Sequence, residues 1–315
     1  MSSRHWFLAE AALSAWTRQK YLREIQAFLE YLDDVGEDPA TIAELDENAC
    51  DYVHLLFEQN NGVGKSRAAH LQSALGFFVP GARGRLHHLG HAVRGWNRLC
   101  PAISYPPLTW ELAVAMALKF VRSGLIREGA AILLQFDCAL RSSELVALRR
   151  KDIVFEGDPR FPADFKGASI SLRHTKTGRD QSVSVEHPDV IRVLKLITHG
   201  MADRDLLFPW DSGKWRRSFK RVTISLGLSP RYVPHSCRHG KATQMFMRGS
   251  PFSEIKLRGR WKASESARRY IQQGVALLSA MQVPRVVAKL GAAFSKQLWV
   301  YFQAALTQKH RGERR

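Results

Sequence analysis

Four short segments of the chain hold residue types that bind an anion, move a proton and attack an electrophile. The first contains Arg141 and Glu144, and further along the chain come His235, Arg238 and Tyr270. A guanidinium presents two parallel donors to phosphate oxygens, and histidine exchanges a proton near neutral pH. A tyrosine hydroxyl supplies an oxygen nucleophile. These types together indicate chemistry on a phosphate ester.

Order and context select these residues, because each spacing alone is common. His-x-x-Arg occurs twice in the chain, at His91/Arg94 and His235/Arg238. A tryptophan followed nine positions later by a tyrosine also occurs twice, once ending at Tyr105 in a proline-rich segment. The upstream pair has no Arg-x-x-Glu before it and no predicted hairpin with a lysine in its turn. The downstream pair has both, Arg141 with Glu144 and then Lys176, so we select the downstream set.

The charge of the chain indicates a polyanionic partner. The 315 residues include 47 Lys and Arg against 29 Asp and Glu, which gives a net charge of +18. Such an excess favours nucleic acid first and an anionic membrane surface second. No run reaches the roughly 18 apolar residues of a membrane span, and the N-terminus makes a poor signal peptide. We expect an intracellular protein, in a nucleus or a bacterial cytoplasm, with four reduced cysteines.

Three prolines between Cys100 and Pro107 predict an interdomain linker, since proline does not continue a helix. Helical periodicity before it predicts helices over residues 14–32, 47–59, 65–78 and 85–99. After it we expect helices over residues 109–122, 126–139, 142–148, 188–198, 212–225, 234–247, 253–257, 264–272 and 284–306. Alternating runs at 169–173 and 182–185 predict a β-hairpin. The fold class is therefore mainly α with a small β-sheet.

We divide the chain into a helical DNA-binding domain at 1–100, a linker at 101–107, a catalytic domain at 108–283 and a C-terminal helix with a basic tail at 284–315. The exposed faces of the first domain carry basic residues that either are solvated or form a phosphate-binding surface: Arg18, Lys20, Arg23, Lys65, Arg67, Arg83, Arg85, Arg94 and Arg98. The last helix carries an apolar stripe that packs on its own domain or, as the family resemblance given in the next paragraph implies, on a neighbouring protomer: Val287, Leu290, Phe294, Leu298, Tyr301 and Ala305.

The selected residues resemble the active-site set of the tyrosine recombinases of the phage integrase type. The set is Arg141, Glu144, Lys176, His235, Arg238, Trp261 and Tyr270. The residues around Arg141 and Arg238 match as well, and the resemblance covers residues from about 108 to 272. The segment Leu257-Arg-Gly-Arg-Trp261 has tryptophan where the family often has histidine, as in the mobile elements of the DIRS and Crypton type.

The resemblance implies a role for each residue. Arg141 and Arg238 would clamp the phosphate, whose non-bridging oxygens gain charge in the transition state. His235 would bind a phosphate oxygen and manage the proton of Tyr270, the nucleophile. Attack would give a 3′-phosphotyrosyl link and a free 5′-hydroxyl.

Three further residues have an ordinary structural alternative each. Glu144 would hold a guanidinium or His235 in place, or form only a local helix pair. Lys176 in the hairpin turn would protonate the leaving 5′-oxygen, or be a solvated lysine. Trp261 would donate its indole N–H to the phosphate, or simply fill the core.

We therefore expect a site-specific recombinase that needs no cofactor and no metal, binds double-stranded DNA and assembles as a homo-oligomer, a tetramer on paired sites. One alternative is a type IB topoisomerase or telomere resolvase with the same residues. Another is a catalytically silent DNA-binding regulator. The target sequence is not encoded in any motif that we find.

Overall fold

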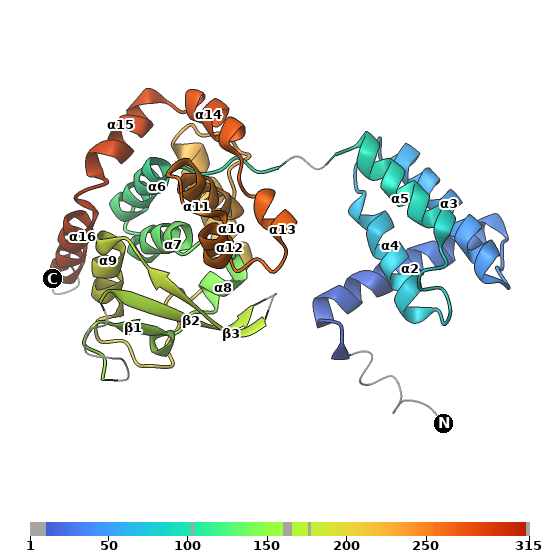
Figure 1. Cartoon of the computed structure of the whole chain (residues 1–315), viewed down its shortest axis with the longest axis horizontal. Coiled ribbons are helices and arrows are strands. Elements are labelled where there is room, and N and C mark those ends of the chain that lie inside the picture. The colour runs from blue at the N-terminus through green and yellow to red at the C-terminus, as the bar shows by residue number, and fades with distance from the viewer. Residues whose placement is uncertain (1–10, 102–103, 160–165, 176–177, 313–315) are drawn as a thin grey trace. The chain divides into compact units, whose positions relative to one another are not determined.

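The computed structural model describes residues 11–101, 104–159, 166–175 and 178–312. The chain divides into two compact units, Met1–Ser104 and Tyr105–Arg315. Each has its own hydrophobic core. Figure 1 shows the first unit as helical and the second as helices with a small sheet.

The described part of the first unit contains the helices α2 (Ala15–Val35), α3 (Ile42–Gln59), α4 (Ser66–Phe78) and α5 (His87–Leu99). Ser14 caps the start of α2, and Gly36 ends it in the left-handed conformation that glycine adopts freely. Helix α5 has no capping side chain of its own. Asp46 on α3 fills that role by accepting from the backbone N–H groups of His88 and Leu89. Pairs α2–α4 and α3–α5 pack around the core.

Two buried helices, α6 (Trp110–Arg122) and α7 (Ile126–Asp137), form the centre of the second unit. Around them lie α8 (Ser142–Val146), the 3₁₀ helix η1 (Arg150–Asp152), α9 (Pro188–Thr198), α10 (Ser212–Ser225), α11 (His235–Met247), α12 (Phe252–Gly259) and α13 (Ser264–Arg268). The predicted mainly helical class with a small sheet is confirmed.

An antiparallel sheet in the order β1-β2-β3 covers one side of this unit (Figure 1). Strands β2 (Ala168–Thr175) and β3 (Gly178–Val185) are the predicted hairpin, and Ile170 pairs with Val183. Strand β1 (Ile153–Phe155) was not predicted, because three residues are too few to show an alternating pattern. The apolar side chains of β2 and β3 join the core, where β2 contacts α8 and β3 contacts α9.

The C-terminal prediction of one helix over 284–306 is wrong. The structure has α14 (Gln273–Met281), α15 (Arg285–Phe294) and α16 (Leu298–Gly312), which run around the outside of the second unit (Figure 1). The predicted apolar stripe packs on its own unit, with α15 against α6 and α16 against α9. Gly291 allows the first contact, since a Cβ there would lie 2.0 Å from the carbonyl oxygen of Glu111.

Among the described residues, no single helix is long and apolar enough to cross a membrane. The bent pair Ser264–Met281 and Arg285–Phe294 meets that test by length and composition.

Candidate functional site

A tight turn between α7 and α8 positions Arg141. Ala139 in this turn has a φ of 48°, in the left-handed region, and Arg141 then stands at the start of α8. Glu144 lies one helical turn later and binds Arg141 twice. Its carboxylate accepts from the Arg141 backbone N–H at 2.8 Å and from the guanidinium at 2.5 Å. The Arg-x-x-Glu spacing thus holds the guanidinium against a buried carboxylate.

Helix α11 carries His235 and Arg238 on one face, one helical turn apart. Arg238 is fully buried and donates to the carbonyl oxygens of Ala139, at 2.7 Å, and Gly259. Its Nε is buried without a hydrogen-bond partner. Burial first, and then the charges of Arg141 and Arg260, lower the pKa of Arg238 from its usual value. An anion placed between these guanidinium groups would relieve that repulsion.

Tyr270 reaches the same place from the segment after α13. Its hydroxyl lies 3.0 Å from Nε2 of His235. Its ring packs on Trp261 with centroids 4.6 Å apart and lies 5.5 Å from the Arg238 guanidinium. The phenol oxygen is therefore beside an imidazole nitrogen, and the phenol ring lies near a cation.

His235 is neutral at physiological pH. Burial, and then the charges of Arg238 and Arg141, lower its pKa to about 4. A neutral imidazole has one acceptor nitrogen, and Nε2, which faces the tyrosine hydroxyl, is that acceptor in the tautomer with its proton on Nδ1. His235 is thus suited to accept the proton of Tyr270.

Trp261 is fixed by the residue two positions before it. A Cβ on Gly259 would lie 1.7 Å from the indole ring, so only glycine leaves room for it. The ring packs 4.5 Å from the Arg238 guanidinium, while its Nε1 is buried without a hydrogen-bond partner. Trp261 is therefore a core residue, and its unpartnered indole N–H leaves donation to a phosphate as a prediction.

The charges of the site favour an anionic ligand over a metal. No group of three His, Cys, Asp or Glu side chains in the described part of the chain could hold a metal ion. The groups that meet here are guanidinium cations, neutral imidazoles, an indole and a phenol, with Glu144 as the carboxylate beside them. Such a set can bind a phosphodiester and present one oxygen nucleophile to it.

Comparison with known families agrees with this geometry. The model of the phage integrase family matches residues 113–275, more than half of the chain. The chain belongs to the phage integrase family. No curated protein matches it significantly by sequence.

Solved structures of integrases share the fold. The integrase of transposon Tn1549, in complex with transposon right end DNA, is 14% identical and has a TM-score of 0.61 over 85% of this chain and 94% of that chain. A lambda integrase dimer bound to a COC′ core site is 16% identical and has a TM-score of 0.60 over 87% of this chain and 96% of that one.

Within this phage integrase domain, six of the seven predicted site residues lie together. Arg141, Glu144, His235, Arg238, Trp261 and Tyr270 are joined by the contacts given above. Lys176, the predicted general acid, lies outside the described residues. The predicted helix over 264–272 is wrong in its last part, since α13 ends at Arg268. Thr243 on α11 instead donates to the carbonyl of Tyr270 and accepts from the N–H of Gln272.

The sequence analysis missed two residues of the site. His239 stacks on the Tyr270 ring with centroids 4.4 Å apart, and burial, then His235 and Arg238, lower its pKa to about 3. Arg260 binds Glu144 at 2.8 Å. The signals were present, because His239 lies one turn after His235 and Arg260 directly precedes Trp261.

Proposed function

We propose that this phage integrase family protein is a site-specific recombinase that cuts and rejoins DNA through Tyr270. The observation that carries the proposal is the 3.0 Å approach of the Tyr270 hydroxyl to Nε2 of a neutral His235, beside the buried Arg238. A proton acceptor and a phosphate-binding cation thus meet at one nucleophile.

In the first step the Tyr270 oxygen attacks the phosphorus of a DNA strand. Nε2 of His235 takes the phenol proton as the new O–P bond forms. The bond from phosphorus to the 5′-oxygen breaks, and that oxygen leaves with a proton from Lys176. Arg141 and Arg238 neutralise the charge that gathers on the non-bridging oxygens. Trp261 adds its free indole N–H to the same oxygens.

The product is a 3′-phosphotyrosine and a free 5′-hydroxyl. The phosphotyrosyl ester replaces one phosphate ester by another, so the reverse attack by a 5′-hydroxyl needs no ATP. Attack by the hydroxyl of a different strand exchanges partners. Integration, excision and inversion all follow from that exchange.

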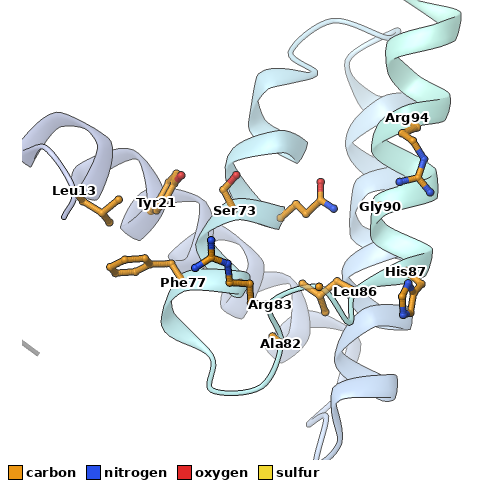
Figure 2. Close-up of a pocket in the computed structure, with 13 residues that line it drawn as sticks. Leu13, Tyr21, Ser73, Phe77, Ala82, Arg83, Leu86, His87, Gly90 and Arg94 are labelled. Carbon is orange, nitrogen blue, oxygen red and sulfur yellow. The ribbon is translucent and has the colours of Figure 1, made fainter. Parts of the chain in front are cut away.

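A pocket of about 500 Å³ in the first unit supports DNA binding there. Figure 2 shows Tyr21 on α2, Ser73 and Phe77 on α4, and Arg94 on α5 around it, with Arg83 beside them. Both arginines are exposed and suit backbone phosphates.

Two other basic residues of the same unit serve its own fold. Lys65 donates to the carbonyl of Cys100, and Arg67 binds the buried Glu24. The DNA-binding surface that we propose therefore contains fewer basic residues than the nine predicted from the sequence, and it is centred on the pocket.

Helix α14, which follows the nucleophile, supports a homo-oligomer on DNA. Its side chains Leu277, Leu278 and Met281 are 52%, 65% and 83% exposed, and all are apolar. An apolar helix face of this kind favours contact with protein. We propose that it contacts a second copy when a tetramer forms on paired sites.

We also propose that the substrate DNA belongs to a mobile element. The Tn1549 integrase complex holds transposon end DNA, which supports a mobile-element substrate for this chain too. The Gly-Arg-Trp segment before Tyr270 favours the DIRS or Crypton type of element. We propose a nucleus or a bacterial cytoplasm as its location, because a DNA substrate is found there.

The direct test is covalent capture on a nicked duplex cut from the DNA that flanks the gene. The nick lets the short product strand diffuse away, so the phosphotyrosyl adduct accumulates. We expect an adduct that survives denaturation and maps to Tyr270. Tyr270→Phe should keep noncovalent DNA binding and form no adduct; an adduct in that variant would overturn the proposal.

The same preparation separates the alternatives. A type IB topoisomerase relaxes a supercoiled plasmid without a special site, whereas a recombinase exchanges strands only between matched sites. A silent regulator binds the duplex and gives no adduct with the wild-type chain.

A further inference from the structure

Arg260 adopts a backbone conformation that glycine would take more easily. It follows α12 with φ 54° and ψ 43°, in the left-handed region. A side chain is disfavoured there because its Cβ approaches the carbonyl oxygen. The contacts of the arginine side chain must therefore offset the backbone strain.

Those contacts converge on the turn that carries Arg141. The Arg260 side chain is buried, and its guanidinium donates to the carbonyl oxygens of Cys138, at 3.2 Å, and Ala139, at 3.2 Å. The same Ala139 oxygen accepts from Arg238. One carbonyl thus ties Arg260 to a phosphate-binding arginine.

A further partner of Arg260 is Glu144. Oε2 of this carboxylate accepts from Arg260 at 2.8 Å, and Oε1 accepts from the Arg141 guanidinium at 2.5 Å. Oε2 also accepts from the Arg141 backbone N–H at 2.8 Å, so Arg141 binds both carboxylate oxygens and Arg260 ties the pair to the turn at Cys138 and Ala139. Without Arg260, the bonds described here would tie Glu144 only to Arg141, so the carboxylate and the Arg141 guanidinium could shift together.

The charge of Glu144 depends on the same neighbour. Burial by itself raises the pKa of this carboxyl, and the Arg260 charge is the first of the opposing causes, ahead of Arg141. The sum lies below the usual value, so the group is ionised at neutral pH.

We propose that Arg260 is a positioning residue for the strand-transfer reaction, acting through Glu144 to fix the Arg141 guanidinium against the scissile phosphate. The inference rests on the proposed function. The Nη1 and Nη2 groups of Arg260 donate to carbonyl oxygens and to Glu144 within the buried turn, and we therefore assign its effect to the position of Arg141.

The test measures single-turnover adduct formation and noncovalent affinity on the nicked duplex. Arg260→Gly relieves the backbone and removes the guanidinium. We expect its cleavage rate to fall about a hundredfold, as for a displaced catalytic group, with its affinity for DNA within about threefold of wild type. Arg260→Lys keeps the charge but not the planar guanidinium with its several donors. Its cleavage rate should lie between those of the wild-type chain and Arg260→Gly. Asn61→Gly relieves a left-handed residue in the first unit and should change neither quantity.

Two readouts separate positioning from a merely structural role. The rate losses of Arg260→Gly and Glu144→Gln should not add in the double variant, since both break one chain of contacts. The acid limb of the pH–rate profile should move to higher pH in Arg260→Gly, because Glu144 loses the cation that lowers its pKa.

The outcomes are distinct. A wild-type chain that forms no adduct overturns the proposed function and this inference with it. The inference alone is overturned if the wild-type chain reacts and both Arg260→Gly and Arg260→Lys react as fast as it does. It is also overturned if the rate losses of the Arg260 variants and of Glu144→Gln add fully in the double variants. If Arg260→Gly melts at a lower temperature than wild type, Arg260→Lys decides.

Discussion

His235 links the chemistry of the site to the stability of the fold. Its pKa is about 4 in the folded chain, against an ordinary value of 6.5. As pH falls, His235 is protonated in the unfolded chain at a higher pH than in the folded chain. The stability that the neutral His235 gives to the folded chain is therefore complete above pH 6.5 and is lost as pH falls toward 4. Partial exposure reduces the full effect, and we expect a loss of about 2 kcal/mol.

The measurement is the free energy of unfolding by denaturant from pH 7 to pH 4. His235→Gln has no imidazole to protonate, so its curve should be flatter than that of the wild-type chain by about that amount. Parallel curves for the two proteins would show that His235 titrates alike in both states.

At the scale of elements, Gly240 controls how the second unit holds α11. A Cβ at this position would lie 1.8 Å from the carbonyl oxygen of Leu108, and Leu108 donates from its N–H to Ser236 on the same helix. The segment that enters the unit thus lies directly on the helix that carries His235 and Arg238. Gly240→Ala should push the two apart and lower the free energy of unfolding by about 1–3 kcal/mol.

Gly274 in α14 is the matched control, because a Cβ there meets no atom within 4 Å. Gly274→Ala should stabilise the chain by up to about 1 kcal/mol through helix propensity. Thermal and denaturant unfolding of both variants measure the difference. A Gly240→Ala variant as stable as wild type would mean that the entering segment is not held where the structure places it.

The elements differ in how far the sequence predicts them. Long amphipathic helices such as α2 and α10 follow from apolar periodicity, because one buried face imposes it. The break between α15 and α16 contains Ser295, Lys296 and Gln297, with no glycine or proline to mark it. The end of α13 depends on Thr243, a residue of another helix, and a local pattern does not show such a contact.

The residues of the site also differ in how far the sequence predicts them. Residues whose spacing follows one helical turn, Arg141 with Glu144 and His235 with Arg238, are predictable because the helix itself brings them together. Arg260 is not, since its role depends on a left-handed backbone and on a turn more than one hundred residues away in sequence. His239 repeats the spacing of α11, but its stacking on Tyr270 needs the tertiary fold.

At the scale of the whole molecule, the net charge of +18 has to act through particular residues to give more than general attraction. Each phosphate neutralised by a basic side chain steepens the fall of affinity with salt by about 0.9 in the double-logarithmic plot. If Arg83 and Arg94 each bind a phosphate, the double variant Arg83→Ala/Arg94→Ala should reduce that slope by about 1.8. Fluorescence anisotropy of a labelled duplex, titrated at salt concentrations from about 50 to 200 mM, measures this slope.

The double variant Arg285→Ala/Lys289→Ala is the charge-matched control. It removes the same two charges from exposed positions on α15 of the second unit, and neither residue lines the pocket around Arg83 and Arg94. Its slope should equal that of the wild-type chain, because counterions are released only where a side chain meets a phosphate. Equal reductions in the two double variants would mean that the chain attracts DNA through its overall charge, and the pocket around Arg83 and Arg94 would then have no special part in binding.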